Sequence, residues 1–245
     1  MAGATSLEVE DVSFAYARQV AVLDGVSATF EGGKITVLLG NNGSGKTTLL
    51  RILAAIASPD SGRVLFDGCP LTRGSIPDYK RMIGFMPELL QMYPEARVAD
   101  LLGFFCALKR IDESAVPKTL ERVGLAARAR TRVNTLSKGM KQRLNLAQAI
   151  LGRPKVVILD EPTNGFDYAS VTSFYPILRG LAREGAIVIL SNHQLAELRG
   201  NVDRIVLMAQ GRITKARAID RDALPGEPET WLEEQALRDF LEVAT

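Results

Sequence analysis

The feature of this sequence that most constrains its fold is a glycine-rich loop between a strand pattern and a helix pattern. The residues Ile35–Leu39 predict a buried strand. The next eight residues, Gly40–Thr47, match the pattern G-x-x-x-x-G-K-[ST], and a helix is expected over Thr47–Ala57, stopped by Ser58-Pro59. A strand, a glycine-rich loop and a helix in this order predict a site for phosphate groups at the start of the helix.

The residue types in this loop are those that phosphate binding requires. Glycines let backbone N–H groups turn inward around phosphate oxygens, and the helix start adds positive potential. In such a loop Lys46 reaches the β- and γ-phosphates and the Thr47 hydroxyl binds Mg²⁺, whereas the alternative is a glycine-rich turn without a ligand. We expect a nucleotide site made by Gly40, Asn41, Asn42, Gly43, Ser44, Gly45, Lys46, Thr47 and Thr48.

A second pattern with chemical meaning lies further along the chain. The four apolar residues Val156–Leu159 are followed directly by two carboxylates, Asp160 and Glu161. A buried strand that ends in aspartate fits the strand that holds Mg²⁺ in phosphate-loop NTPases. The adjacent Glu161 is placed to orient or deprotonate an attacking water. The alternative is a pair of solvated loop carboxylates, but the preceding apolar strand favours a catalytic site.

The remaining patterns predict an α/β fold. Two stretches, Leu7–Phe14 and Val20–Phe30, look like half-buried antiparallel strands. The segment Val98–Leu151 has the apolar spacing of helices, and short apolar strands alternate with helices on both sides of it. We expect a largely parallel sheet covered on both faces, with a helical insertion. The other expected elements are strands at Arg63–Phe66, Met82–Met86, Ile187–Leu190 and Ile205–Met208 and a stretch between strands at Val171–Leu181.

Composition argues against several other classes of protein. Thirty basic and 28 acidic residues give a net charge of +2, too small a bias to indicate a nucleic-acid partner. Two cysteines, Cys69 and Cys106, are too few for a disulfide framework, and the single histidine, His193, excludes a multi-histidine metal site. The densest apolar runs are four or five residues long, and a spanning helix needs about 20. Without a signal-peptide pattern, a cytoplasmic location is expected.

With these motifs in place, residues 7–216 resemble the ATP-binding subunits of ABC transporters. Leu136–Met140 stands where that family has its Leu-Ser-Gly-Gly-Gln signature, and Lys141–Leu144 continues the pattern. The resemblance implies an α/β phosphate-loop NTPase fold of ABC type, with a RecA-like core and an N-terminal antiparallel β subdomain. It also implies an inserted helical subdomain over about residues 89–151, within an ATPase domain at residues 1–220.

The resemblance assigns roles to further residues. Tyr16 matches the aromatic residue that stacks on adenine, although a lone aromatic after a strand also fits simple packing. Asp167 corresponds to a residue of cross-subunit contacts, and His193 to a histidine that contacts the γ-phosphate. Ser137 and Gly139 correspond to signature residues that bind a phosphate presented by another subunit, which suits Ser137 at a helix start.

The sequence departs from the usual family pattern at two places. Lys138 and Met140 replace a glycine and a glutamine of the signature, in a version that resembles subunits paired with ABC-2-type export permeases. Glu88 stands where the family usually has a glutamine whose oxygen can bind Mg²⁺. A carboxylate accepts hydrogen bonds only, so Glu88 is either a third metal ligand beside Thr47 and Asp160 or an exposed hinge carboxylate.

The function implied by this resemblance is an ATPase subunit of a membrane export complex, using ATP and Mg²⁺. Two copies would close head to tail over two ATP molecules, with Lys46, Glu161 and His193 from one copy as catalytic residues and Ser137 from the other. The expected partners are a permease and a second copy, which would hold the chain at the inner membrane face. A fainter resemblance points to copper-site maturation of nitrous-oxide reductase. The alternatives are a soluble, non-transport ABC ATPase and a nucleotide-dependent switch without turnover.

Two regions have two possible interpretations. The segment Met86–Ala96, where the family docks a permease, carries apolar side chains that are either exposed for that partner or packed internally: Leu89, Leu90, Met92 and Tyr93. Residues 221–245 read as a linker followed by a short amphipathic helix that begins with a capping box at Thr230–Glu233. That helix packs either on the rest of the chain or on a partner.

Overall fold

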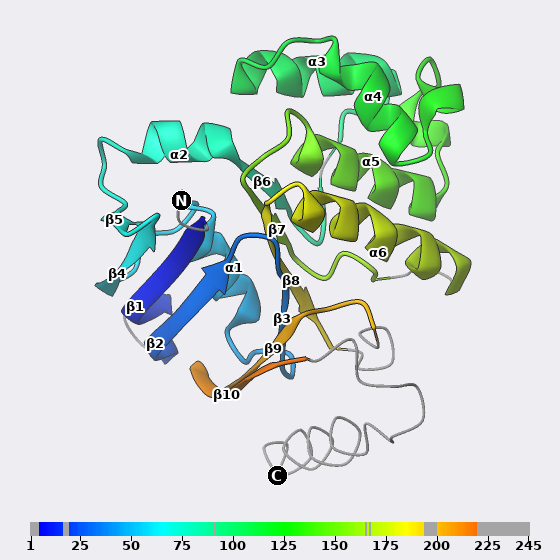
Figure 1. Ribbon diagram of the computed structural model, residues 1–245. Helices are drawn as coiled ribbons and strands as arrows, with labels where there is room; N and C mark the ends of the chain where they lie inside the picture. The colour runs from blue at the N-terminus through cyan, green and yellow to red at the C-terminus, as the bar shows by residue number, and fades with distance from the viewer. Residues whose placement is uncertain are drawn as a thin grey trace.

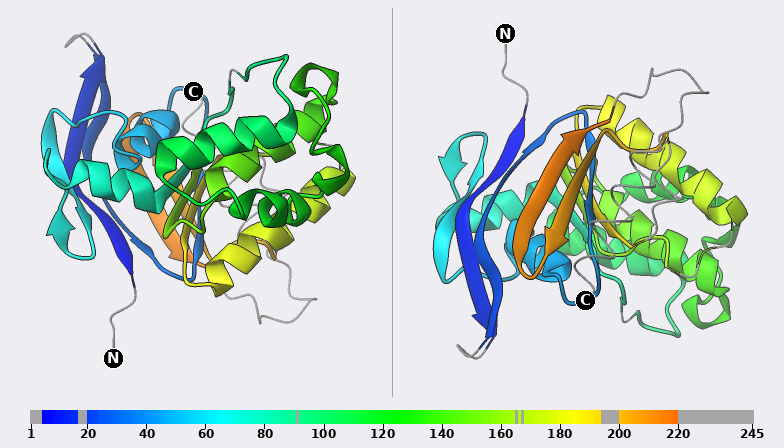
Figure 2. Two further views of the ribbon diagram at one scale, coloured as in Figure 1. Left: turned by 90° about the horizontal axis from the view of Figure 1, so that it is seen from above. Right: turned by 90° about the horizontal axis from the view of Figure 1, so that it is seen from below.

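The computed structural model describes residues 5–16, 20–90, 92–164, 166, 168–193 and 200–219. These residues form two β-sheets and a group of helices, arranged as layers on one another (Figures 1 and 2). The smaller sheet lies on the left in Figure 1, the larger sheet runs through the centre, and the helices α3, α4 and α5 lie together at the upper right.

The smaller sheet is antiparallel and has the strand order β2-β1-β4-β5. Leu7 faces Phe30 across the first strand pair, and both side chains are fully buried. This confirms the half-buried antiparallel strands expected near the start of the sequence. The strands are β1 (Ser6–Tyr16), β2 (Val20–Glu31), β4 (Ser61–Phe66) and β5 (Cys69–Pro70).

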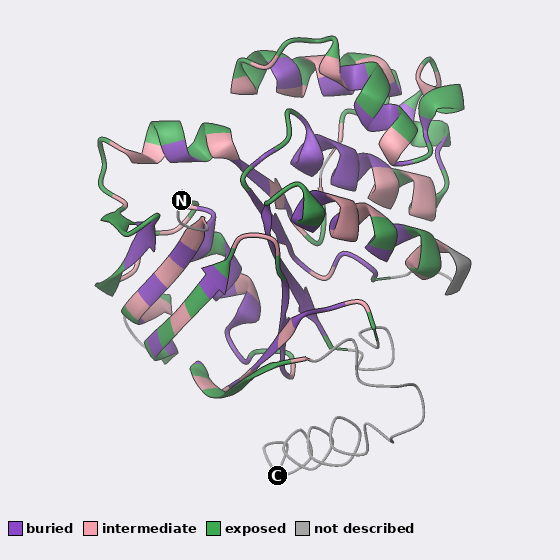
Figure 3. Ribbon diagram, viewed as in Figure 1, coloured by how far each residue is buried: buried purple, intermediate pink, exposed green. Residues whose placement is uncertain are grey.

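The larger sheet has the order β10-β9-β3-β8-β7-β6 and is parallel except for β10, which runs antiparallel to β9. Every residue of β3, β7 and β8 is buried, as Figure 3 shows by the purple strands at the centre. Burial on both faces explains why these strands read as continuous apolar runs. The strands are β3 (Ile35–Leu39), β6 (Ile83–Met86), β7 (Val156–Leu159), β8 (Ile187–Asn192), β9 (Arg204–Ala209) and β10 (Arg212–Ala218).

Alternate side chains of the central strands enter two separate apolar cores. Val157 and Leu159 of β7 pack with the helices of the insertion, whereas Val156 and Ile158 pack with α1 and the smaller sheet. The larger sheet is therefore covered on both faces, as expected. The helices are α1 (Lys46–Leu53), α2 (Ile76–Met82), α3 (Val98–Lys109), α4 (Ala115–Arg122), α5 (Lys138–Ile150) and α6 (Tyr168–Arg183). Among these described helices, none is both long and apolar enough to cross a bilayer.

Two local expectations are wrong. The first helix was expected to reach Ala57 but ends at Leu53, because Ala55 turns to a φ of 52° and Ile56 N–H donates to the Arg51 carbonyl. Met82 was expected to begin a strand but is the last residue of α2. Local patterns place element ends poorly because backbone turns of this kind depend on tertiary contacts.

Gly84 marks a close approach between β6 and α5. A Cβ atom at Gly84 would lie 1.8 Å from the Ala149 carbonyl oxygen, a distance that no side chain can occupy. We predict that Gly84→Ala lowers the free energy of unfolding by about 1–3 kcal/mol, because α5 must move away from the sheet. Urea unfolding followed by circular dichroism measures this change.

Gly103→Ala is the matched control for this prediction. Gly103 lies inside α3, and a Cβ atom there would meet nothing closer than Glu113 Oε1 at 3.5 Å. Alanine is the better helix former, so this variant should be as stable as the wild type or up to about 1 kcal/mol more stable. Equal stability of the two variants would contradict the close approach at Gly84.

Candidate functional site

The glycine-rich loop joins the end of β3 to the start of α1, as the sequence predicts. Gly45 is the N-cap of α1 and has a φ of 100°, a left-handed conformation that favours glycine. A Cβ atom at Gly40 would lie 2.3 Å from the Met208 carbonyl oxygen and 2.6 Å from Ser44 Oγ. The loop therefore depends on glycine at both ends to wrap tightly in front of the helix.

The loop contains a buried polar atom that fits an anionic ligand. Among the described side chains, Ser44 Oγ is one of the few buried polar atoms without a hydrogen-bond partner. A buried hydroxyl without a partner costs free energy, and a phosphate oxygen could accept a hydrogen bond from it. A Cβ atom at Gly43 would meet nothing within 4 Å, so there is open space beside the loop. These features support a phosphate group bound at Gly40–Thr47.

Lys46 lies folded into the same loop. Its ammonium group donates to the carbonyl oxygens of Gly40 at 2.7 Å and Asn41 at 3.1 Å, and lies 4.0 Å from Glu161 Oε1. Only 6% of the side chain is exposed. Burial lowers the pKa of Lys46, and the carboxylates of Glu161 and Asp160 oppose this effect. Lys46 is thus a desolvated cation at the point where the γ-phosphate of a bound nucleotide is expected.

Asp160 is the centre of a buried hydrogen-bond network. Its Oδ1 atom accepts from the Thr47 hydroxyl at 3.1 Å and from the Ser191 hydroxyl at 2.8 Å, and its side chain is 3% exposed. The backbone N–H of Glu161 in turn donates to Ser191 Oγ at 2.7 Å. This network joins the start of α1 to the carboxyl ends of β7 and β8.

The donor atoms of Thr47 and Asp160 suit Mg²⁺. A hydroxyl and a carboxylate are hard oxygen ligands, and Mg²⁺ commonly takes one or two carboxylates together with phosphate oxygens and water. Within the described ranges, no group of three or more His, Cys, Asp and Glu side chains is arranged to hold a metal ion. A magnesium ion here would therefore be bound partly by these two side chains and partly by phosphate oxygens of the nucleotide.

Glu161 and His193 form the second pair of the site. His193 Nδ1 lies 2.8 Å from Glu161 Oε2, so a proton on Nδ1 would be donated to the carboxylate. Glu161 is 13% exposed and His193 is 41% exposed, so the pair faces outward from the buried network. The backbone of Glu161 has a φ of 46°, a strained conformation for a residue with a side chain and one that is common at functional sites.

Tyr16 lies beside the start of α1. The ring is half exposed, and the Arg51 guanidinium donates to its hydroxyl at 3.5 Å. A hydrogen bond with the Thr48 side chain and the nearby Arg51 lower the pKa of Tyr16, while burial opposes them. The edge of the ring meets Phe14, with ring centroids 4.9 Å apart. Tyr16 and Thr48 are thus adjacent, and an exposed ring face near the loop is compatible with stacking on a base.

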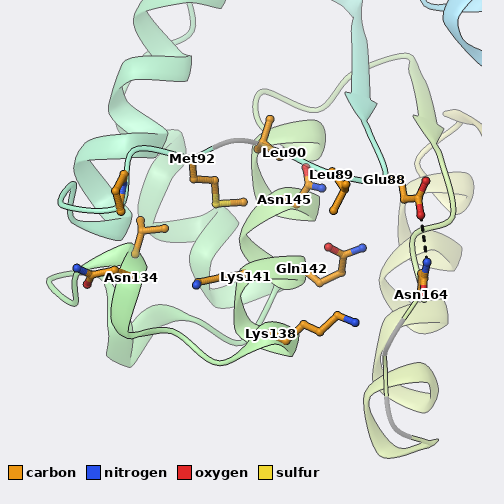
Figure 4. A pocket seen from close by; sticks show the side chains of 12 residues that line it. Glu88, Leu89, Leu90, Met92, Asn134, Lys138, Lys141, Gln142, Asn145 and Asn164 are labelled. Atoms are coloured by element: carbon orange, nitrogen blue, oxygen red, sulfur yellow. Dashed lines mark hydrogen bonds between the residues drawn. The ribbon is translucent and has the colours of Figure 1, made fainter.

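Glu88 lies two residues beyond the end of β6. Asn164, in the turn after Glu161, donates its side-chain amide to Glu88 Oε1 at 3.2 Å (Figure 4). The preceding residue Pro87 is fixed as well, because Asn145 donates to its carbonyl oxygen at 2.8 Å. The assignment of Glu88 to the metal stays a prediction, and its observed partner is Asn164.

The signature residues lie at the start of α5. Ser137 is the N-cap of this helix, its hydroxyl accepts from the Met140 N–H at 3.3 Å, and the residue is exposed. Gly139 faces α6, where a Cβ atom would lie 3.9 Å from Ser170 Oγ. Helix α5 packs on β6, β7, α3 and α4 rather than on α1. Asp167, the remaining expected site residue, lies outside the described residues.

The structure adds two residues that sequence reasoning did not assign to the site. Ser191 holds Asp160 and the Glu161 backbone, and Asn164 holds Glu88. Ser191 could have been found from the sequence, because it is a small hydroxyl residue in an apolar strand, two positions before His193. Asn164 gave no comparable signal, because its contact joins two loops far apart in the sequence.

Comparison with known proteins identifies the family. A family model described as "ABC transporter" matches residues 23–164. YdbJ of Bacillus subtilis (strain 168), an uncharacterized ABC transporter ATP-binding protein, is 38% identical over 194 residues, and the match covers 78% of this chain and 63% of YdbJ. SrtF of Streptococcus pyogenes, a lantibiotic transport ATP-binding protein, is 30% identical over 214 residues, covering 87% of this chain and 91% of SrtF.

A solved structure shows the same fold. The dimeric structure of MJ0796, a bacterial ABC transporter cassette, superposes with a TM-score of 0.79 at 23% identity and covers 87% of this chain and 99% of that chain. The expected α/β architecture, with its antiparallel β subdomain and helical insertion, is confirmed. The sequence matches, the fold and the phosphate-binding loop agree, and the chain belongs to the ABC transporter family as one of its ATP-binding ATPase subunits.

Proposed function

We propose that this chain hydrolyses MgATP between two head-to-tail copies and thereby drives a separate membrane permease. The observation that carries the proposal is the hydrogen-bonded chain from Thr47 through Asp160 and Ser191 to the Glu161 backbone. These hydrogen bonds connect the residues expected to bind phosphate and metal with the residue expected to carry the catalytic carboxylate. A change at the phosphate site would therefore reach the position of Glu161.

Each of the site residues in one copy has a separate role in catalysis. Lys46 and the N–H groups of the loop would bind the β- and γ-phosphate oxygens, with Lys46 leaving its loop carbonyl partners to do so. Thr47 and Asp160 would hold Mg²⁺, which neutralises charge on the transferring phosphoryl group. Glu161 would accept a proton from the attacking water, and His193, fixed on Glu161 Oε2, would orient that carboxylate. The further contact of His193 with the γ-phosphate belongs to the same proposal.

The second copy supplies the signature residues. Ser137 is exposed at the start of α5, and the N-terminus of a 13-residue helix attracts anions. Because α5 packs away from α1 within one chain, this helix start is available for a nucleotide held by another copy. MJ0796, which has the same fold, is known as a dimer. Closure of two copies would then convert nucleotide binding into movement of the attached permease.

The permease is proposed to dock at a groove of about 350 Å³ between the segment after β6 and the start of α5 (Figure 4). Leu89, which lines this groove, is 85% exposed. Beside the groove, Tyr93 lies between the lining residues Met92 and Pro94 in the sequence, is 68% exposed, and its ring meets the half-exposed Phe104 of α3. Met92 instead packs against the core, and Leu90 is only partly exposed. An exposed apolar surface of this kind suits a protein partner.

Export is the proposed direction, because the signature version Leu136–Met140 resembles that of subunits paired with ABC-2-type export permeases. The lantibiotic transport role of SrtF gives no support to the copper-maturation role of the fainter resemblance. The chain would lie on the inner face of the membrane through its permease. A soluble ATPase or a switch without turnover remains the alternative, and phosphate release by the purified chain separates the switch from the enzyme.

The first prediction from the proposed function concerns Glu161. Glu161→Gln keeps the shape of the side chain but removes the carboxylate that accepts the proton, so phosphate release should fall about 100-fold or more while ATP stays bound. The variant should also accumulate as a closed dimer in MgATP, measured by size-exclusion chromatography. Glu121→Gln, an exposed carboxylate of α4, is the control and should behave as wild type. Unchanged turnover in Glu161→Gln would remove Glu161 from the mechanism.

The second prediction concerns His193. His193→Ala should lower phosphate release about tenfold or more, because Glu161 loses the ring that fixes its Oε2 atom. ATP binding, measured with a fluorescent nucleotide, should change little. His193→Gln keeps a hydrogen-bond donor and should recover part of the rate. If both variants hydrolyse ATP as the wild type does, His193 has no catalytic role.

The third prediction concerns the exposed aromatic pair Tyr93 and Phe104 beside the permease groove. Tyr93→Asp with Phe104→Asp should abolish co-purification of the integral membrane partner from detergent-solubilised host membranes, because two charges would enter the apolar contact. Hydrolysis by the isolated chain should stay within about twofold of wild type. Ala126→Asp, exposed on a 3-10 turn of the same subdomain, is the control. Retention of the partner by the double variant would place the permease elsewhere.

A further inference from the structure

A second groove lies at the opposite edge of the larger sheet from the phosphate-binding loop. It has a volume of about 720 Å³ and lies between the end of β2, the starts of β3 and β9, and the end of β10. Because β3 runs from this groove to Gly40, the groove is separated from the nucleotide site by the whole length of the strand. Nothing in the proposed ATPase mechanism uses it.

The groove is lined by an excess of positive charge. Lys34, Arg204 and Arg217 contribute cations, and Glu31 and Asp203 contribute carboxylates. The carboxylate of Asp203 is already compensated, because it accepts from Arg179 at 2.7 Å and from the Ile35 N–H at 2.7 Å while being only 5% exposed. The cations therefore outweigh the remaining acid, Glu31.

The residues that follow the groove in the sequence carry the opposite charge. Ile219 lines the groove and is the last described residue before 220–245. That segment contains eight acidic and two basic residues, whereas residues 1–219 contain 28 basic and 20 acidic residues. The net charge of +2 thus conceals a charge of about −6 on one segment and +8 on the rest.

We propose that residues 220–245, named here the acidic segment, dock in this groove of their own chain. Chain continuity favours this occupant, because Asp220 follows Ile219 directly and Asp222 lies within about 10 Å of it at full extension. A tethered segment also reaches its site at an effective concentration in the millimolar range, so weak charge contacts suffice. Ala216 and Ala218 give the groove an apolar wall for the apolar side chains of the predicted helix.

The docked segment would also cover a sheet edge. β10 is the edge strand of the larger sheet, and most of its residues are exposed. Exposed edge strands invite pairing with other chains, and proteins commonly protect them with charges or a covering segment. The cations that line the groove would then serve both to discourage pairing at this edge and to bind the acidic segment.

Trp231, the single tryptophan of the chain, reports on this docking directly. The test is quenching of its fluorescence by acrylamide, a neutral quencher, in the full-length chain. The variant Lys34→Glu with Arg217→Glu reverses the groove charge at two exposed residues and should raise the quenching constant about twofold or more, with emission shifted to the red. The wild type in 1 M NaCl should respond in the same direction.

Three further arms decide the interpretation. Lys118→Glu with Arg128→Glu, exposed in the helical insertion, changes the net charge equally and should leave quenching unchanged. By itself, the variant Glu233→Lys with Glu234→Lys should raise the quenching constant. Combined with the groove variant, it should restore the protection of Trp231 from acrylamide. Equal quenching in the groove variant and the wild type would overturn the proposal. An effect that disappears on dilution of the protein would overturn it as well, because the occupant would then be a second copy.

Discussion

The rest of the site depends on the hydrogen bonds that the buried carboxylate of Asp160 accepts. A carboxylate this deep in a protein is costly unless hydrogen bonds satisfy it. Here the hydroxyls of Thr47 and Ser191 do so, and each comes from a different element. The carboxylate therefore fixes the start of α1 against the ends of β7 and β8. The same network leaves oxygen atoms of Thr47 and Asp160 side by side, which is the arrangement that a magnesium ion needs.

Sheet register brings these elements together. β3, β8 and β7 are parallel neighbours, with Leu39 opposite Asn192 and Leu159 opposite Leu190. Their carboxyl ends therefore meet at one edge, where ligands bind in open α/β sheets. The strained turn at Glu161 then directs its side chain towards Lys46 and His193.

Sequence alone predicts those parts of the fold that depend on neighbouring residues. The loop at Gly40–Thr47 and the acidic pair after Val156–Leu159 are found because their spacing is local and their chemistry is specific. The short helix α2 was not predicted, and the end of α1 was misplaced, since both depend on tertiary packing. The contact of Asn164 with Glu88 could not be predicted, because it joins two loops whose approach is set by α5 and the sheet.

A mixing experiment tests most directly whether one catalytic site is built from two copies. Lys46→Ala removes the phosphate-binding lysine, and Ser137→Arg blocks the signature helix start, so each variant alone should be inactive. A mixed dimer regenerates one intact site from the unmodified halves. Equal mixing should therefore restore about a quarter of wild-type phosphate release. Mixed dimers without restored phosphate release, or full activity of Ser137→Arg alone, would contradict a site shared between copies.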